Sequence, residues 1–303
     1  MLHMKDKFSN VQFGIRPNMR TADSLFLFET LINKSFNLLK KPIYSCFIDL
    51  RKAFDSVWRN GLFSKFQSSG IGSNTIKIIH GMHTDTKFSL KRTEGITDYF
   101  TINRRVRQFD SLSSTLFKIY INDMTELFIN SKCDPLSLEY SCIGSLTFTD
   151  DLLVHLDSKE GLQESLNKFS LYCKEWQLTV NCNKTKTMIF GKYLKNIKNT
   201  KFSYRNTYLE NISEFKFLRN VITQNRNFVS CAEALSKKAP KVMYSIKSYT
   251  SSLNELPVNV PLFDSLVRPI LTYNCEIWNM DDYKPYFNAT ERAKKDNFNV
   301  DQM

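Results

Sequence analysis

The sequence predicts an α+β fold, in which an antiparallel sheet packs on helices. A strand, a tight turn and a second strand are indicated between Ser145 and Val154, because Val, Leu, Phe and Thr flank a polar centre there. The apolar run from Ile43 to Asp49 is typical of a buried strand. Apolar residues at helical spacing predict helices over about residues 21–41 and 158–176.

Length and composition are those of a globular protein with a basic surface. With 303 residues, 42% of them hydrophobic, the chain can bury a core and form one large or two smaller domains. No apolar run is long enough to span a membrane, and the start of the sequence lacks the apolar region of a secretory signal. The 7 cysteines are irregularly spaced, which favours reduced thiols over a zinc site. We therefore expect an intracellular protein of the cytoplasm or nucleus.

Two adjacent carboxylates occupy the centre of the predicted hairpin. Asp tolerates turn dihedrals, so Asp150 and Asp151 are expected at the hairpin tip. Two like charges side by side repel, and a divalent cation between them would relieve that repulsion. The alternative is a solvated turn that happens to carry two acids.

A third carboxylate, Asp49, ends the predicted strand 43–49. Burying a lone charge is costly, so an acid at the end of an apolar strand suggests a partner. If this strand lies beside the hairpin in one sheet, Asp49 can converge with Asp150 and Asp151. Three carboxylates make an oxygen-rich site suited to Mg²⁺, and paired metals held in this way assist in-line phosphoryl displacement.

Positive charge is concentrated after the hairpin. The net charge is +12, and the stretch from Trp176 to Leu209 contains several bases and no acid. Aromatic residues alternate with these bases, which favours contact with a nucleic-acid backbone, whereas a solvated basic loop is the alternative. The bases in this stretch are Lys184, Lys186, Lys192, Lys195, Lys198, Lys201 and Arg205.

These segments occur in the same order as the sequence motifs of a known protein family. Phe47-Ile-Asp49-Leu-Arg-Lys-Ala-Phe54-Asp55-Ser-Val resembles motif A of the reverse transcriptase domain of non-LTR (LINE-type) retrotransposons, and Phe148-Thr-Asp150-Asp151 resembles its motif C. Tyr172 to Phe190 is similar to the motif D region, and Phe215-Lys-Phe-Leu218 to motif E. Phe13 to Thr21 resembles the segment before motif A. The resemblance extends over about residues 10–280.

The resemblance implies roles for the acidic and aromatic residues of motifs A and C. Asp49 and Asp150 would be the main metal ligands, with Asp151 as the second carboxylate of the turn. Together they would hold two Mg²⁺ ions, with Mn²⁺ as an alternative. Phe54 stands where the family has its steric gate, so its ring would crowd a ribose 2′-hydroxyl and favour deoxynucleotides. The alternative for Phe54 is an ordinary core side chain.

The resemblance also implies roles in motifs B and D. Gln108 falls in motif B, where it would lie near the incoming nucleotide and the template. Lys184 or Lys186 would be the motif D lysine that protonates departing pyrophosphate, since a lysine near phosphates can act as a general acid. The alternative for both lysines is a solvated surface position.

The implied architecture is the right-hand polymerase fold. Residues 1–225 would form partial fingers and an antiparallel palm, and residues 226–303 a helical thumb with a polar tail. The implied activity is that of an RNA-directed DNA polymerase, which extends a DNA primer on an RNA template with deoxynucleoside triphosphates and without a membrane partner.

Three departures from the family pattern support a second hypothesis, a catalytically inactive remnant that keeps the fold. Phe109 and Ser114 stand where motif B has Gly and Pro, and Arg219 stands where motif E has Gly. A Phe ring would obstruct the close backbone approach that Gly allows. The matching segment also begins after the family's first fingers motifs, whose bases hold the triphosphate, and no endonuclease domain is matched. We therefore expect this chain on its own to polymerise poorly or not at all.

Overall fold

The computed structural model describes residues 8–83, 87–93, 95–101, 111–129, 136–138, 141–191, 200–250 and 261–277. The chain forms two compact units, Met1–Ser24 with Leu31–Asn211, and Leu25–Thr30 with Ile212–Met303. Each unit has its own apolar core. Among the described helices, none has the length and apolar character needed to cross a bilayer.

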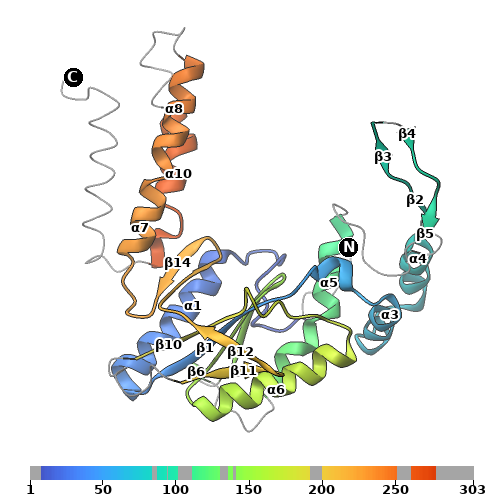
Figure 1. Ribbon diagram of the computed structural model, residues 1–303, viewed down its shortest axis with the longest axis horizontal. Coiled ribbons are helices and arrows are strands. Elements are labelled where there is room, and N and C mark those ends of the chain that lie inside the picture. The colour runs from blue at the N-terminus through green and yellow to red at the C-terminus, as the bar shows by residue number, and fades with distance from the viewer. Residues whose placement is uncertain are drawn as a thin grey trace. The chain divides into compact units, whose positions relative to one another are not determined.

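The first unit is built on a six-stranded sheet with the order β11-β12-β10-β1-β9-β8 (Figure 1). The predicted central strand is observed as β1, between β9 and β10, and it is antiparallel to both. The pairing of β10 with β12 is parallel, and the other four pairings are antiparallel. The strands are β1 (Ile43–Asp49), β8 (Ser145–Phe148), β9 (Asp151–Leu156), β10 (Lys186–Phe190), β11 (Phe202–Tyr204) and β12 (Thr207–Asn211).

The predicted hairpin and the predicted strand are thus confirmed, and they are neighbours in one sheet. β8 and β9 form the hairpin, and β9 lies along the whole of β1. The strands β11 and β12 were not predicted, because their residues include polar side chains without a sustained apolar alternation.

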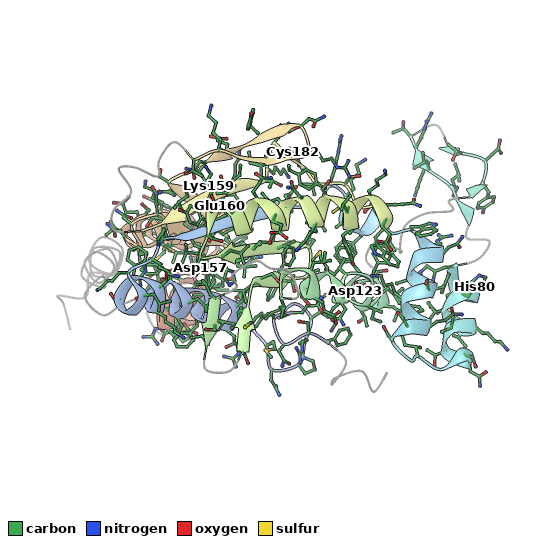
Figure 2. The ribbon with its side chains drawn as sticks, turned by 90° about the horizontal axis from the view of Figure 1, so that it is seen from below. His80, Asp123, Asp157, Lys159, Glu160 and Cys182 are labelled. Carbon is green, nitrogen blue, oxygen red and sulfur yellow. The ribbon has the colours of Figure 1, made fainter. Side chains whose placement is uncertain are left out.

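Helix α6 (Lys159–Glu175) covers one face of the sheet (Figure 1). It begins where expected, since the Ser158 hydroxyl accepts a hydrogen bond from the Gly161 amide at 3.2 Å and so satisfies a free amide of the first turn. Its apolar side chains Leu162, Leu166 and Phe169 are buried against the strands. Figure 2 labels Lys159 and Glu160 at the start of this helix.

The remaining elements include the helix predicted over 21–41, whose residues Leu25–Thr30 belong to the second unit. The helix predicted over 21–41 is regular to Lys34 and continues as a π-helix to Leu39, where Lys40 ends it in a left-handed conformation with φ 54°. The helices are α1 (Thr21–Lys34), η2 (Ser35–Leu39), α2 (Ala53–Ser56), α3 (Arg59–Ser68), α4 (Ser73–His83), α5 (Ser111–Tyr120) and η3 (Asn122–Phe128). Short strand pairs are β2 (Lys87–Phe88) with β5 (Phe100–Thr101), β3 (Lys91–Arg92) with β4 (Gly95–Ile96), and β6 (Leu136–Leu138) with β7 (Ser141–Ile143).

The second unit combines a hairpin with helices around a small core. Its hairpin turn, Leu218-Arg219, has φ values of 46° and 67°, and a two-residue turn with both φ values positive normally takes Asn-Gly. Arg219, one of the departures from the family pattern, therefore occupies a backbone position that favours glycine. The elements are β13 (Glu214–Phe217), β14 (Asn220–Thr223), α7 (Val229–Ser236), α8 (Ala239–Thr250), η5 (Phe263–Val267), α10 (Arg268–Leu271) and η6 (Cys275–Ile277).

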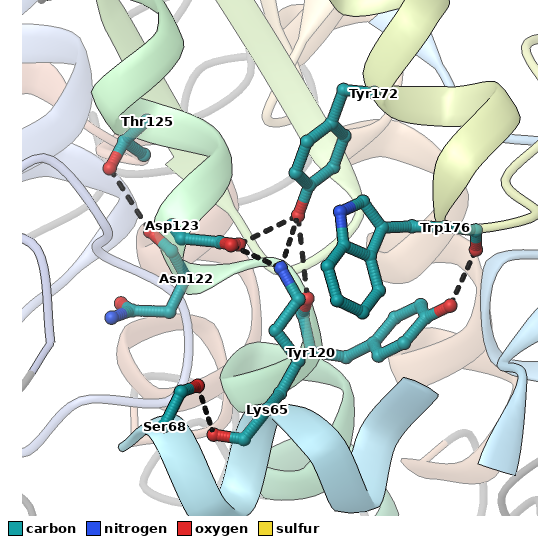
Figure 3. A network of polar contacts seen from close by, with 8 residues as sticks. All are labelled: Lys65, Ser68, Tyr120, Asn122, Asp123, Thr125, Tyr172 and Trp176. Atoms are coloured by element: carbon teal, nitrogen blue, oxygen red, sulfur yellow. Dashed lines mark hydrogen bonds and ion pairs between the residues drawn. The ribbon is translucent and has the colours of Figure 1, made fainter. Parts of the chain in front are cut away.

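A buried lysine ties three helices of the first unit together (Figure 3). Lys65 of α3 forms an ion pair with Asp123 of η3, and its ammonium lies 3.6 Å from the ring centre of Trp176. The Tyr172 hydroxyl of α6 accepts from Lys65 at 3.2 Å and donates to Asp123 at 2.8 Å. Burial lowers the pKa of Lys65, and the carboxylate of Asp123 opposes that shift. The ammonium is therefore kept charged in a confined site by one acid and aromatic rings.

This network predicts a stability effect that an ordinary surface ion pair lacks. Asp123→Ala leaves the Lys65 ammonium without its acid, and we expect the free energy of unfolding to fall by about 1–3 kcal/mol, allowing for the partial exposure of Asp123. Lys168→Met, which breaks the exposed pair with Glu164, should change it by less than about 0.5 kcal/mol. Urea titration measures both. Equal effects of the two substitutions would contradict the role given to Lys65.

Candidate active site

The strand register places two of the three predicted acids opposite each other. Asp49, the last residue of β1, is paired with Asp151, the first residue of β9. Side chains directly opposite in an antiparallel pair point to the same face, with Cα atoms about 4.5–5.5 Å apart. Neighbouring residues of both strands, such as Ile48 and Leu152, belong to the core under α6. By alternation, Asp49 and Asp151 point to the other face of the sheet.

The third acid lies in the turn that joins β8 to β9. Phe148 is paired with Asp151, so Thr149 and Asp150 form the two-residue connection. Thr149 has φ 60°, a left-handed conformation that β-branched residues adopt rarely. The turn therefore places Asp150 directly before the strand position of Asp151, at the same end of the sheet as Asp49.

The charges of these acids affect one another. Partial desolvation, followed by the charge of Asp49, raises the pKa of Asp150, although a hydrogen bond to its own backbone opposes this. Desolvation, then the charges of Asp150 and Asp49, raise the pKa of Asp151 to about 6, even though residue Asp151 as a whole retains an exposed edge. Among the ion pairs in the described residues, none involves these three acids. The site thus carries like charges that a cation would stabilise.

The donor set suits a hard divalent cation. Carboxylate oxygens are the ligands that Mg²⁺ prefers, and a bound cation would offset both the desolvation and the like charge that raise the pKa values of Asp150 and Asp151. Within the described ranges, no three His, Cys, Asp or Glu side chains are already gathered around one point as a metal cluster. Strand pairing makes Asp49 and Asp151 neighbours, and the oxygen ligands of the three acids are of the type that a divalent cation takes.

The end of β1 is fixed from its other side by the turn that carries Lys184. The Asp49 amide donates to the Thr185 hydroxyl at 3.2 Å, and the Asp49 carbonyl accepts from the Asn181 amide at 2.8 Å. Lys184, between these two contacts, is exposed. The candidate proton donor therefore lies in a segment that touches the backbone of a candidate metal ligand.

Phe54 lies on α2, which begins four residues after Asp49. Its side chain is half-buried, and its ring centre lies 4.9 Å from that of Phe117 on α5. Packing of this kind satisfies a core side chain, and the remaining exposure leaves part of the ring accessible. Both interpretations of Phe54 therefore remain compatible with its position.

The basic residues are spread over different surfaces. Lys186 is paired in register with Phe47, on the face of the carboxylates, and forms an ion pair with Glu210. Lys201 is exposed, with its ammonium 5.8 Å from the ring centre of Tyr208. Arg205 donates to the Ser170 hydroxyl of α6 at 3.1 Å, on the helix-covered side of the sheet. The candidates Gln108, Lys192, Lys195 and Lys198 lie outside the described residues.

One contact at the site was not predicted. Residues 11–13 run parallel to β8, with the Phe13 amide donating to the Thr147 carbonyl at 2.8 Å. From the sequence, only Phe13 of this segment was placed, at the start of the stretch that resembles the segment before motif A. Apolar residues at the alternate positions Val11 and Phe13 were its one local sign of extended structure.

The chain matches the sequence model of a known protein family. Residues 1–219 match the model described as "Reverse transcriptase (RNA-dependent DNA polymerase)". The chain belongs to the reverse transcriptase family. The match includes all three candidate acids, the hairpin between them and Lys184. The resemblance drawn from the motif order is thereby confirmed.

Curated relatives of this reverse transcriptase domain include polymerases of insect mobile elements. The RNA-directed DNA polymerase from mobile element jockey of Drosophila funebris is 23% identical over 279 residues, which cover 89% of this chain and 29% of that protein. The type-1 retrotransposable element R2 polyprotein of Nasonia vitripennis is 26% identical over 167 residues, which cover 55% of this chain and 16% of that protein. The chain thus spans less than a third of the length of these relatives.

Solved structures with the same fold include telomerases. Telomerase from Candida albicans, in complex with a fragment of telomeric RNA, aligns with a TM-score of 0.56 at 12% identity over 95% of this chain and 52% of that chain. Apo telomerase from Candida tropicalis aligns with a TM-score of 0.56 at 14% identity over 96% and 49%. At these identities the alignments establish the polymerase fold, which confirms the predicted fold class.

The raised pKa of Asp151 predicts a pH dependence of stability. A carboxyl that holds its proton more tightly in the folded state destabilises the fold as it ionises, from about pH 4 up to its folded pKa of about 6. Asp151→Asn removes this effect, so the variant should gain stability over the wild type as pH rises through that window. Because the side chain is partly solvent-screened, the gain should be about 1 kcal/mol or less.

Urea titrations at pH 4 and pH 7 measure this gain. Asp98→Asn, at an exposed position, is the matched control and should show the same small difference at both pH values. If Asp151→Asn behaved like the control, the raised pKa of Asp151 would be refuted.

Proposed function

We propose that this chain is the catalytic palm of an RNA-directed DNA polymerase, in which two divalent ions assist transfer of a nucleotide from a deoxynucleoside triphosphate to a primer 3′-hydroxyl. The observation that carries the proposal is the pairing of Asp49 with Asp151 beside the turn residue Asp150. Membership in the reverse transcriptase family supports it. The domain outline that goes with it has partial fingers and palm in residues 1–225 and a thumb in 226–303.

The three acids would hold the metal ions, Mg²⁺ or alternatively Mn²⁺. Asp49 and Asp150 approach from two strand ends, and Asp151 adds a second carboxylate on the same face as Asp49. When bound, such a metal pair lowers the charge barrier to in-line displacement. The protein's contribution is positional, because near-attack geometry tolerates misplacement of only about 1 Å before the rate falls by about a hundredfold.

Other side chains would orient the substrates. Lys184, on the turn that contacts Asp49, would donate a proton to departing pyrophosphate. The accessible part of the Phe54 ring would exclude a ribose 2′-hydroxyl. Gln108 would pack near the incoming nucleotide.

The template and primer would be RNA and DNA. The printed name of the jockey relative describes RNA-directed DNA synthesis, and the Candida albicans telomerase was solved with telomeric RNA. A net charge of +12 favours binding to phosphate backbones. The bases proposed to contact the nucleic acid are Lys186, Lys192, Lys195, Lys198, Lys201 and Arg205.

The rival function is an inactive remnant that binds nucleic acid without synthesis. Two residues favour it: Phe109, where the family pattern has a small residue beside the nucleotide, and Arg219, which occupies a turn position with φ 67° that favours glycine. Both departures affect positioning and leave the three acids in place.

Primer extension tests the proposal. The unmodified chain, supplied with Mg²⁺, deoxynucleotides and a DNA primer on an RNA template, should extend the primer, if only weakly. Asp49→Asn and Asp150→Asn should each reduce the rate by more than about a hundredfold, because each removes a charge that holds the metal. Asp98→Asn is the control and should keep the wild-type rate.

The outcomes separate the two functions. If the unmodified chain is inactive, Phe109→Gly in a chain extended with a related fingers segment should recover extension, and Asp150→Asn in that background should abolish it. Extension that persists in both Asp49→Asn and Asp150→Asn would overturn the proposed site.

A further inference from the structure

The N-terminal segment extends the sheet along β8, the strand that leads into the carboxylate turn. Gln12 bridges to Thr147 in a parallel arrangement. The Phe13 amide donates to the Thr147 carbonyl at 2.8 Å, and the Thr147 amide donates to the Val11 carbonyl at 3.0 Å. These hydrogen bonds fix the position of the next residue, Gly14, relative to the turn.

Gly14 lies so close to the turn that no side chain fits. A Cβ atom added there would lie 2.3 Å from the Thr149 backbone nitrogen, 2.6 Å from the Thr149 hydroxyl oxygen and 3.0 Å from the Phe148 carbonyl carbon. The first two distances are shorter than any ordinary carbon contact, and the first is to backbone, which cannot rotate away. The φ of Gly14 lies outside the left-handed region, so space and not dihedral strain requires glycine here.

The residue that Gly14 touches is itself held in an unfavourable conformation. Thr149 has φ 60°, which is unfavourable for a β-branched residue and persists only where the surroundings enforce it. Thr149 is followed at once by Asp150 and Asp151. Any displacement of its backbone is therefore passed directly to both carboxylates of the turn.

The segment cannot easily move away from the turn. Gln12 and Phe13 are buried, with 1% and 5% of their surfaces exposed. The Lys118 ammonium of α5 donates to the Ile15 carbonyl at 2.9 Å, on the far side of Gly14. The contact is thus anchored on both sides, and a side chain at residue 14 would displace the turn in preference to the segment.

We propose that Gly14 is a positioning residue for the metal-binding carboxylates, because its lack of a side chain lets the N-terminal segment clamp Thr149 and so fixes where Asp150 and Asp151 stand relative to Asp49. This inference rests on the proposed function for its catalytic consequence. Its structural content, the clamp on the turn, stands without it.

Substitution at residue 14 tests the clamp in the full chain. Gly14→Ala should weaken Mn²⁺ binding, followed by electron paramagnetic resonance, by about 10- to 100-fold, the usual loss when a group that orients a metal ligand is changed. Primer extension should lose kcat while KM for the deoxynucleotide changes little. Amide hydrogen exchange should accelerate at residues 147–151. Gly72→Ala and Gly81→Ala, where an added Cβ meets nothing within 4 Å, are the matched controls and should change none of these.

A second background keeps the test decisive if Gly14→Ala does not fold. Thr149→Gly removes the hydroxyl that an added Cβ at residue 14 would meet. Glycine also adopts the left-handed conformation of this turn without strain. In that background Gly14→Ala should fold and still weaken Mn²⁺ binding several-fold. Unchanged Mn²⁺ affinity and unchanged exchange at residues 147–151, in either background, would overturn the inference.

Failure of the proposed function gives a different pattern. If the unmodified chain neither binds Mn²⁺ nor extends primers, the metal site is wrong, and hydrogen exchange at the turn alone then decides the clamp. Faster exchange in Gly14→Ala than in the Gly72→Ala and Gly81→Ala controls would support the clamp even so, and equal exchange would refute it.

Discussion

The pairing of Asp49 with Asp151 across β1 and β9 is the interaction on which the candidate site depends. β1 is the central strand of its sheet, and its position is fixed by hydrogen bonds to β9 and β10 on its two sides. A shift of one residue in this register would turn one acid into the core under α6. The side chains of Cys46, Ile48, Leu152 and Val154 pack in the core under α6, and the register keeps Asp49 and Asp151 on the opposite face. The position of the two acids therefore depends on the register of β1 and β9.

The same site concentrates features that oppose folding. Three acids lie together without an ion-pair partner among the described residues, and Thr149 has an unfavourable φ of 60°. Strain and like charge of this kind are typical of functional sites, where the surrounding structure enforces them. The Lys65 network differs, since its buried charge is matched by Asp123 and enclosed by aromatic rings. The charge of Lys65 is therefore balanced within the protein. The charges of Asp49, Asp150 and Asp151 would be balanced by a bound cation.

Sequence reasoning succeeded where the signals are local. The strand ending at Asp49, the hairpin around Asp150 and the helix capped by Ser158 are each encoded in a few adjacent residues, and each is observed. The resemblance to a known family supplied what local patterns cannot, the adjacency of strand and hairpin.

Contacts between segments that are distant in the sequence were not predicted. Lys65 looks like a surface lysine in sequence, because its partner Asp123 is 58 residues away. Lys186 and Arg205 looked like free bases, but they interact with Glu210 and Ser170. The requirement for glycine at Gly14 was not singled out in the sequence, because the backbone that leaves no room for a side chain there belongs to Thr149, far along the chain. Long-range contacts of this kind produce no hydrophobic periodicity in the sequence, so pattern analysis does not detect them.

The central claim is that the three acids bind divalent ions between β1 and the hairpin turn. Anomalous diffraction from crystals of the chain soaked in Mn²⁺ tests it most directly, because it locates the ions without relying on activity. The account predicts anomalous peaks within about 2.5 Å of carboxylate oxygens from both Asp49 and Asp150, and the loss of those peaks in Asp150→Asn. Peaks that avoid these carboxylates, or an unchanged pattern in Asp150→Asn, would contradict it.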